Sequence, residues 1–341
     1  MAAITQRESG LWEARIRRRG QPTQSKTFTN KRDAEAWGRH AESQIERGAF
    51  VSTSRAERTT LMALAQRFAD EFAPGHYRSS AWQIKLQHLV QRLGVYSIAA
   101  LTPERLAGYR DQRLADPDPR YKEPGTAPRV SGATVKTELD LLSKVLGWAE
   151  KEGGVPLPLG NPVDRISKPK PGASRERRLT GAEAEALERA CARSLNRWLL
   201  PAYQFAVATA MRQGELLGLT WNRVNMATRV AWLPKTKNGE PRAVPLSSAA
   251  VAVLQALPRS IDEKVFPVEK QTLATVFRTA CRRAGIENFR WHDLRHEALS
   301  RLAERGDLSV LELSAISGHK TLRMMQLYVK MHAEKLAQKL G

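Results

Sequence analysis

The chain has 341 residues, 42% of them hydrophobic, which is enough for two or three domains that each bury a core. Its 55 Lys and Arg residues against 35 Asp and Glu give a formal net charge of +20, which predicts a polyanionic partner. The sequence has no run of about 18 apolar residues, and its first residues, MAAITQRESG, contain no signal-peptide core. We therefore expect a cytoplasmic protein that binds nucleic acid rather than a membrane.

Cysteine and metal-binding patterns indicate neither a disulfide framework nor a metal site. The two cysteines, Cys191 and Cys281, are too few and too isolated for a disulfide framework or a Cys-based zinc site, so we expect both to be buried and reduced. The sequence contains no HExxH, paired-Asp or Walker motif. Any chemistry on a phosphate is therefore expected to use protein groups alone.

Residues 1–56 are predicted to form a small basic sheet followed by a helix. Residues 10–29 alternate apolar and basic side chains around a Gly-Gln-Pro turn, which is typical of strands. From residue 30 the apolar side chains recur at helical spacing. A DNA-contacting arm is the expected role, with a solubilising extension as the alternative. The residues expected to contact DNA are Arg15, Arg17, Arg18 and Arg19.

Residues 57–164 are predicted to form a domain of four or more helices. Apolar residues repeat at helical spacing in four segments, which are 59–73, 80–94, 102–116 and 131–153. Residues 165–178, RISKPKPGASRERR, are typical of an extended basic linker. We expect its Lys168, Lys170 and Arg175 to lie along DNA phosphates, with a solvated hinge as the alternative.

Residues 179–341 are predicted to be mostly helical with one small antiparallel sheet. Thr180 and Glu183 match a capping box before a helix, and an apolar helix then runs to Met211. Two short β runs, VAWL and RAVPL, flank KTKNGE, whose Asn-Gly pair is typical of a hairpin turn. The fold class predicted for the whole chain is mainly α with small β-sheets (α+β).

Cleaving a phosphodiester without a metal requires a nucleophile, fixed cations and an acid for the leaving alkoxide. Arg212 and Glu215 are three positions apart, a spacing that lets the carboxylate support the guanidinium. His292 and Arg295 have the same spacing, so both can address one small anion. Taken alone, each pair is more typical of structure than of function, and Lys237 is more typical of a solvated turn.

The ordered combination resembles the signature of the tyrosine recombinases, or phage-type integrases. It continues with His319 and, nine positions later, Tyr328. The stretches that carry the resemblance are distributed over residues 179–341 and are TAMRQGELLGLTW, KTKNGEPRAVPL, HDLRHEALSRLAERG and ISGHKTLRMMQLYVK. Two positions depart from the usual pattern, because Ala210 stands where Gly is usual and Gln326 where Thr is common.

The resemblance implies a role for each residue of the signature. Tyr328 is the nucleophile, which forms a 3′-phosphotyrosyl link and frees a 5′-hydroxyl. Arg212 and Arg295 clamp the non-bridging oxygens, and His319 helps to hold the phosphate or the transition state.

The remaining signature residues have supporting roles in the same resemblance. His292 accepts the tyrosine proton, because its ordinary pKa of about 6.5 lies near neutral pH. Lys237 protonates the 5′-oxygen. Glu215 supports Arg212, and Asp293 orients a neighbour.

The resemblance also implies the biological setting. The family recombines DNA as a homotetramer on two paired sites, through a Holliday junction, without ATP or a metal cofactor. The expected partners are double-stranded DNA at core and arm sites, with accessory DNA-bending or directionality proteins, and the expected location is the cytoplasm, at the nucleoid when bound. The expected outcome is integration or excision of a mobile element or prophage. The alternatives are a shufflon-like inversion recombinase, a type IB topoisomerase and a catalytically silent DNA-binding regulator.

Overall fold

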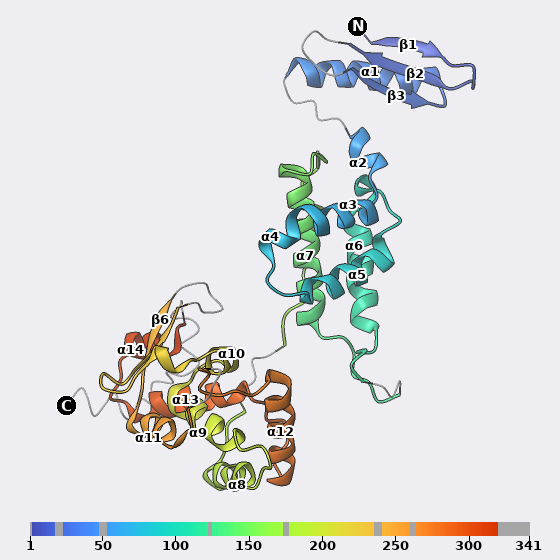
Figure 1. Cartoon of the computed structure of the whole chain (residues 1–341). Helices are drawn as coiled ribbons and strands as arrows, with labels where there is room; N and C mark the ends of the chain where they lie inside the picture. The colour runs from blue at the N-terminus through green and yellow to red at the C-terminus, as the bar shows by residue number, and fades with distance from the viewer. Residues whose placement is uncertain are drawn as a thin grey trace, which may run out of the picture. The chain divides into compact units, whose positions relative to one another are not determined.

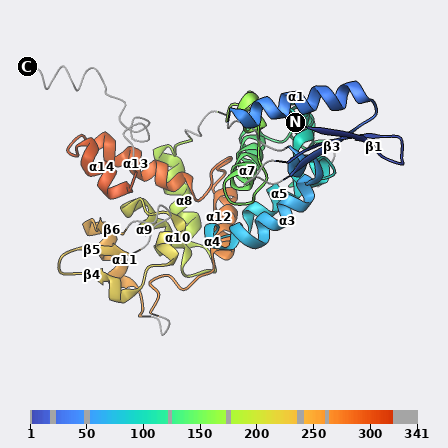
Figure 2. The ribbon, with the colours of Figure 1, turned by 90° about the horizontal axis from the view of Figure 1, so that it is seen from above.

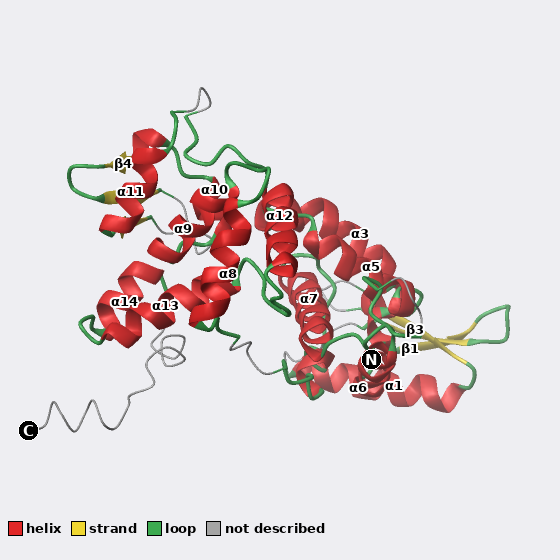
Figure 3. Ribbon diagram, turned by 90° about the horizontal axis from the view of Figure 1, so that it is seen from below, coloured by secondary structure: helices red, strands yellow, loops and turns green. Residues whose placement is uncertain are grey.

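The computed structural model describes residues 2–17, 23–47, 53–121, 125–172, 177–234, 241–259 and 263–319. The chain divides into two compact units, Met1–Ala173 and Ser174–Gly341 (Figure 1). Within the described residues most of the chain is helical, and the strands form two antiparallel sheets of three strands each (Figure 3). The predicted class, mainly α with small sheets, is confirmed.

The first unit begins with a three-stranded sheet and one helix, and Figure 2 shows the helix beside the sheet. The elements are β1 (Ala3–Gln6), β2 (Trp12–Ile16), β3 (Gln24–Phe28) and α1 (Lys31–Glu46). Ile16 of the central strand packs with Ala41 and Ile45 of α1 in a small core. The helix begins where the Asn30 side chain accepts the backbone N–H of Asp33 at 2.8 Å. The predicted sheet and helix are confirmed, and β1 is an additional strand that the sequence pattern did not indicate.

The rest of the first unit is a helical bundle around α7. Its elements are α2 (Ser54–Arg58), α3 (Leu61–Arg67), the π-helix η1 (Phe68–Phe72), α4 (Ala73–His76), α5 (Ala81–Leu93), the 3₁₀ helix η2 (Ile98–Ala100), α6 (Pro103–Ala115), α7 (Gly132–Lys151) and the 3₁₀ helix η3 (Pro162–Arg165). The side chains of Leu139, Leu142 and Leu146, spaced by three and four positions, are fully buried on α7. The helices lie where the apolar repeats predicted them.

The second unit is built around the apolar helix α9. Its elements are α8 (Gly181–Ala192), α9 (Leu199–Thr209), α10 (Gln213–Leu217), η4 (Trp221–Arg223), β4 (Val224–Asn225), β5 (Val230–Leu233), β6 (Arg242–Pro245), α11 (Ser248–Ala256), α12 (Lys270–Arg283), α13 (Asp293–Arg305) and α14 (Val310–Ser317). The α9 helix contacts α8, α11 and α13, so it forms the centre of this core. The predicted capping box is confirmed, since Thr180 Oγ1 accepts the N–H of Glu183 and the Glu183 carboxylate accepts the N–H of Thr180.

The small sheet of the second unit matches the two predicted β runs. Strands β5 and β6 pair antiparallel, with Leu233 opposite Arg242, and β4 adds a short third strand that was not predicted. The turn expected at Asn238-Gly239 lies outside the described residues. Strand β6 lies beside α14, which brings the hairpin close to the end of that helix (Figure 1).

The ends of three helices position Arg212, Arg295 and His319. Helix α9 is followed directly by Ala210, whose backbone is left-handed with φ 51°. Arg212 is the residue directly before α10. Helix α14 is followed directly by Gly318, whose backbone is left-handed with φ 67°. Helix α13 begins directly after His292.

Candidate active site

Arg212 and Glu215 form the ion pair that their spacing predicted. Arg212 Nη1 donates to Glu215 Oε1 at 2.8 Å, and the backbone N–H of Arg212 donates to Glu215 Oε2 at 3.0 Å. Glu215 thereby accepts the backbone N–H of Arg212 at the start of α10 and also fixes the Arg212 guanidinium. Arg212 Nη2 also points to the carbonyl oxygen of Gly318, 3.5 Å away.

Arg295 lies on the first turn of α13 and is almost fully buried, with 4% of its surface exposed. Its Nη1 donates to the carbonyl oxygen of Ala210 at 2.6 Å, and its Nη2 donates to that of Ser317 at 2.5 Å. The same Nη2 lies 3.4 Å from Nε2 of His319. Arg295 therefore joins the ends of α9 and α14, and it brings His319 close to a guanidinium.

The carbonyl groups at the end of α14 each accept a hydrogen bond from a different arginine. Ile316 accepts from Arg242 Nη1, Ser317 from Arg295 Nη2 and Gly318 from Arg212 Nη2. The last carbonyls of a helix lack partners within the helix and carry partial negative charge, which suits guanidinium donors. We call residues 316–319 the α14 turn. The sequence signature predicts Arg212 and Arg295 in the site but does not indicate Arg242.

Glu215 is shared between Arg212 and Arg242. Arg242 Nη2 donates to Glu215 Oε2 at 2.7 Å, and only 6% of the Glu215 side chain is exposed. Burial by itself raises the pKa of Glu215, but the charge and hydrogen bond of Arg242, followed by the hydrogen bonds of Arg212, more than offset that effect and lower the pKa. Glu215 is therefore an ionised carboxylate that holds two guanidinium groups.

His319 is neutral at physiological pH. Desolvation, followed by the charges of Arg295 and Arg212, lowers its pKa to about 4. Because a guanidinium only donates hydrogen bonds, Nε2 of His319 is the acceptor opposite Arg295 and Nδ1 carries the proton. The backbone of His319 is tied down as well, since its carbonyl oxygen accepts from Ser314 Oγ at 2.6 Å.

His292 is an exposed residue directly before α13. Partial desolvation lowers its pKa, and His296 and Arg295 lower it further. The ring of His296 stands edge-on to that of His292, with centroids 5.3 Å apart. At pH 7 the imidazole of His292 is accordingly neutral, as a proton acceptor must be.

The start and middle of α13 are fixed by buried carboxylates. Asp293, which was expected to orient a neighbour, accepts the backbone N–H of Arg290 at 2.9 Å. Glu297 is 1% exposed and accepts from the N–H of Leu179 at 3.1 Å, from Arg178 and from Arg301. The segment that enters the second unit is thus bound to the helix that carries Arg295.

The structure brings together Arg212, Glu215, Arg295 and His319 from the predicted set, with His292 on the same helix end as Arg295. Lys237 and Tyr328 lie outside the described residues, so their predicted roles stay predictions.

The residues predicted to contact DNA are placed differently from one another. Arg15 pairs with Glu13 at 3.1 Å, and Lys168 pairs with Asp140 of α7 at 2.8 Å. Arg17 and Lys170 are exposed. The predicted contacts Arg18, Arg19 and Arg175 lie outside the described residues.

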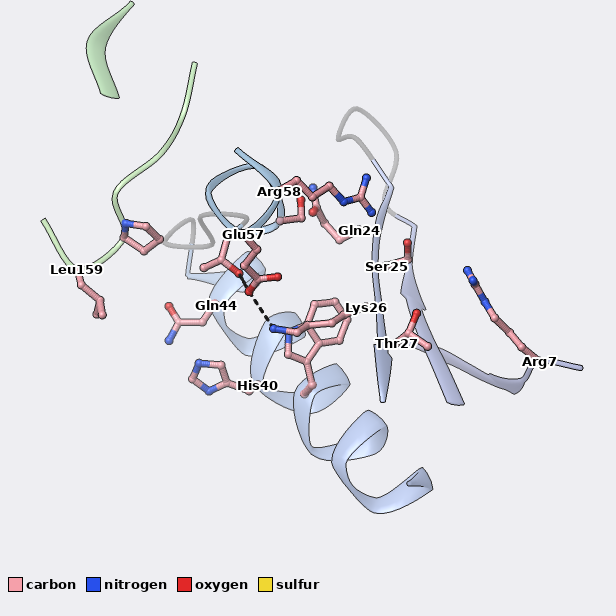
Figure 4. Close-up of a pocket in the computed structure, with 14 residues that line it drawn as sticks. Arg7, Gln24, Ser25, Lys26, Thr27, His40, Gln44, Glu57, Arg58 and Leu159 are labelled. Carbon is pink, nitrogen blue, oxygen red and sulfur yellow. Dashed lines mark hydrogen bonds and ion pairs between the residues drawn. The ribbon is translucent and has the colours of Figure 1, made fainter. Parts of the chain in front are cut away.

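A hollow of about 660 Å³ in the first unit lies between β3, α1 and α2 (Figure 4). Lys26 and Glu57, 3.0 Å apart, form an ion pair beside it, and His40, Gln44 and Arg58 also line it. Each partner of the ion pair is about 40% exposed, so the pair contributes little to stability. The hollow contains none of the candidate catalytic residues.

The described part of the chain has buried cysteines and neither a metal-binding cluster nor a membrane-spanning helix. Cys191 and Cys281 are buried, as predicted, and desolvation raises the pKa of each thiol to about 12, so neither is a reactive thiolate. The described residues contain no group of three or more His, Cys, Asp or Glu side chains that could hold a metal ion. No helix within these ranges is long and apolar enough to cross a membrane.

Comparison with known sequences places this site in a family. Residues 177–335 match the phage integrase family. A Haemophilus influenzae protein named as an integrase/recombinase is 31% identical over 332 residues, which cover 92% of this chain and 83% of that protein. The chain belongs to the phage integrase family. The shufflon-specific DNA recombinase of Escherichia coli is 41% identical over 240 residues, which cover 70% of this integrase-family chain and 60% of that recombinase.

Solved structures of integrases share the fold of this chain. A lambda integrase dimer bound to a COC′ core site aligns with a TM-score of 0.62 and 21% identity, over 95% of this chain and 94% of that one. The Tn1549 transposon integrase in complex with circular intermediate DNA aligns with a TM-score of 0.61 and 18% identity, over 83% of this chain and 99% of that one. The likeness confirms the integrase-type fold predicted from the signature.

Proposed function

We propose that this integrase-family chain is a site-specific DNA recombinase that cuts and rejoins DNA through a 3′-phosphotyrosyl intermediate. The observation that carries the proposal is the convergence of Arg212, Arg295 and His319 on the end of α14. Arginine forks bind phosphate oxygens and keep their charge at any physiological pH. Such a site suits a phosphodiester whose non-bridging oxygens gain negative charge as it reacts.

In the proposed cleavage step the hydroxyl oxygen of Tyr328 attacks phosphorus, and the bond from phosphorus to the 5′-oxygen breaks. His292 accepts the tyrosine proton, for which its lowered pKa leaves it available at pH 7. Lys237 donates a proton to the departing 5′-oxygen, so a 5′-hydroxyl leaves. The phosphate ester is retained in the phosphotyrosine, and attack by the 5′-hydroxyl of another strand rejoins the DNA without ATP.

The fixed groups of the site stabilise the charge that develops during this step. Arg212 and Arg295 bind the two non-bridging oxygens, and Glu215 keeps Arg212 in place. His319 donates from Nδ1–H to the phosphate while its Nε2 accepts from Arg295.

The proposed partner is double-stranded DNA, bound at core sites and, through residues 1–56, at arm sites. By analogy with a lambda integrase tetramer bound to a Holliday junction, the working assembly is a tetramer on paired sites. The proposed division of the chain is an arm module at 1–56, a helical core-binding domain at 57–164, a linker at 165–178 and a catalytic domain at 179–341. The proposed location is the cytoplasm.

DNA inversion is a second candidate within the same chemistry. The similarity to a shufflon-specific DNA recombinase, at 41% identity, favours it. Integration, excision and inversion use the same cleavage step and differ in how the two sites are placed and oriented.

The test is covalent capture of DNA by the full-length protein. Duplexes that tile the DNA flanking its gene, each nicked so that cleavage cannot be reversed, are incubated with the protein and resolved under denaturing conditions. We expect one duplex to give a protein–DNA adduct at a 3′ end. The variant Tyr328→Phe should give none, whereas Tyr121→Phe, which alters an exposed tyrosine of the first unit, should match the unchanged protein.

The captured site then separates the alternatives. Placed twice in a supercoiled plasmid, in direct or inverted orientation, it should give deletion or inversion products. Relaxation without recombinant products would identify a type IB topoisomerase, and binding without an adduct would identify a silent regulator. An adduct that persists in Tyr328→Phe would remove Tyr328 as the nucleophile.

A further inference from the structure

Arg242 is a largely buried arginine to which the signature assigns no role. It is the first residue of β6, and 11% of its side chain is exposed. Its Nη2 donates to Glu215 Oε2 at 2.7 Å, and its Nη1 donates to the carbonyl oxygen of Ile316. One guanidinium therefore connects the hairpin strand, helix α10 and the end of α14.

The contact with Glu215 controls how that carboxylate meets Arg212. Glu215 Oε1 binds the guanidinium of Arg212, while Oε2 binds the backbone N–H of Arg212 and the guanidinium of Arg242. Among the groups that lower the pKa of Glu215, Arg242 has the largest effect. Without Arg242, the buried carboxylate would be left with Arg212 as its only charged partner in the described part of the site, and it would lose one of its three hydrogen bonds there.

The contact with the α14 turn sets the position of His319. A Cβ built on Gly318 would lie 2.9 Å from Cδ of Arg242, so the side chain of Arg242 packs directly against the backbone of the turn. Arg242 is also one of the three arginines that bind the carbonyls of residues 316–318. Removing it would leave the Ile316 carbonyl, three residues before His319, without this donor, and it would open space beside Gly318, the residue directly before His319.

We propose that Arg242 is a positioning residue that orients Arg212, through Glu215, and His319, through the α14 turn, for binding the scissile phosphate. The proposal rests on the proposed recombinase function, since it assigns Arg242 to that same site. Arg242 is assigned a positioning role because its Nη2 donates to Glu215 and its Nη1 to Ile316, two contacts that fix other residues of the site. The same connection links these groups to the hairpin on which Lys237 is predicted to lie.

The test compares single-turnover cleavage of two substrates by the full-length protein. One is the nicked duplex captured in the adduct experiment, and the other carries a methylphosphonate at the scissile position. Replacing a non-bridging oxygen by a methyl group removes one negative charge, so the clamp formed by Arg212 and Arg295 matters less for the second substrate. The variants are Arg242→Met, Arg242→Lys and Arg212→Ala, with Arg223→Met as a control that removes one exposed positive charge.

We expect Arg242→Met to cleave the phosphate duplex about 10²-fold more slowly, as expected when catalytic groups are misplaced by about an ångström. DNA binding should stay close to that of the unchanged protein, whereas the unfolding temperature should fall, because the buried Glu215 loses one of its charged partners. On the methylphosphonate this deficit should shrink by about tenfold or more, as it should for Arg212→Ala. Arg242→Lys, which keeps the charge but loses the paired donors, should fall between, and Arg223→Met should cleave both substrates normally.

The outcomes separate the two proposals. An equal deficit of Arg242→Met on both substrates, or no deficit, while Arg212→Ala prefers the methylphosphonate, would overturn the role of Arg242 alone. If Arg212→Ala shows no such preference, the phosphate clamp is wrong and the role of Arg242 falls with it. If Arg242→Met fails to fold, the cleavage rates of Arg242→Lys are compared with those of the unchanged protein. A deficit that is smaller on the methylphosphonate supports the role of Arg242, and an equal deficit or none overturns it.

Discussion

Arg295 donates from Nη1 to the carbonyl oxygen of Ala210 at 2.6 Å, and Ala210 presents that oxygen from a left-handed backbone with φ 51°. A left-handed conformation costs a residue with a Cβ about 1–2 kcal/mol, which explains why glycine is usual at this position in the phage integrase family. The Cβ of Ala210 is fully buried against Ala298 and Leu299 of α13. Burying one such carbon contributes about 0.8 kcal/mol, so packing offsets much of the strain.

Substitution of Ala210 should therefore separate strain from packing. Ala210→Gly relieves the strain but loses the buried methyl, and we expect its free energy of unfolding to stay within about 1 kcal/mol of the unchanged protein. Ala210→Val adds a β-branched side chain at a positive φ in a full core, and we expect a loss of about 2–4 kcal/mol. Urea unfolding measures both, and a Val variant as stable as the unchanged chain would contradict the left-handed geometry.

The acid stability of the second unit should depend on His319. Its pKa is about 4 in the folded protein against about 6.5 in an unfolded chain, so between these pH values the unfolded state binds a proton that the folded state does not. Stability should thus be complete above about pH 6.5 and fall as the pH drops towards 4. Histidine NMR titration should place the His319 midpoint near 4, and His319→Gln should flatten the decline measured by urea unfolding at pH 7 and pH 5. A midpoint near 6.5 would contradict the buried, arginine-flanked position.

The role of Lys237 can be tested through the leaving group. Removing a general acid should slow cleavage by about 10²–10⁴-fold, so Lys237→Ala should be nearly inactive on ordinary DNA. A thiol has a pKa of about 8.5 and leaves readily without a proton, so sulfur at the 5′-bridging position should restore cleavage by Lys237→Ala. Arg212→Ala should not be restored, because the non-bridging oxygens are unchanged. Equal rescue of both variants, or of neither, would assign the proton to another residue, with Lys235 the next to test.

Glu297 and Glu304 provide a matched pair for testing how the entering segment is anchored. Both bind Arg178, but Glu297 is 1% exposed and also binds Arg301 and the N–H of Leu179, whereas about half of the Glu304 side chain is exposed. Glu297→Gln should lower the free energy of unfolding by about 2 kcal/mol, the loss of charge-assisted hydrogen bonds to a buried acceptor. Glu304→Gln should cost less than about 1 kcal/mol. Urea unfolding checks this, and equal losses would show that burial of Glu297 is unimportant.

Cleavage should not require a divalent metal ion. The positive charge that stabilises the reacting phosphate is assigned to Arg212 and Arg295, both already held in place by protein groups. The rate of adduct formation should therefore be unchanged in excess chelator. A strand-cleavage step that needs added Mg²⁺ would count against the proposed clamp.

Local patterns predicted much of this molecule. The Thr180–Glu183 capping box and the Arg212–Glu215 pair each join residues three positions apart, so they are visible in the sequence. The helices followed from apolar periodicity for the same reason. Strand β1 was missed because its four residues, Ala3–Gln6, are mostly exposed and show no alternation of burial.

Arg242 could not be found in the sequence, because its partners are set by the tertiary fold. Glu215 lies 27 positions before it and Ile316 lies 74 positions after it. In isolation, an arginine at the start of a short strand after a basic turn is typical of a solvated residue. The packing of Arg242 against Gly318 indicates that it belongs to the site, and only the folded chain shows this packing.

The shared carboxylate of Glu215 sets the net charge of the side chains that surround the α14 turn. Arg212, Arg242 and Arg295 contribute three positive charges, Glu215 contributes one negative charge, and His319 is uncharged at pH 7, which leaves two positive charges among these groups. A phosphodiester has one negative charge at rest and gains a second as a nucleophile adds to phosphorus. In the proposed reaction the net charge of these side chains therefore matches the doubly negative transition state better than the singly negative phosphodiester of bound DNA. Binding the transition state more strongly than the ground state is what accelerates a reaction.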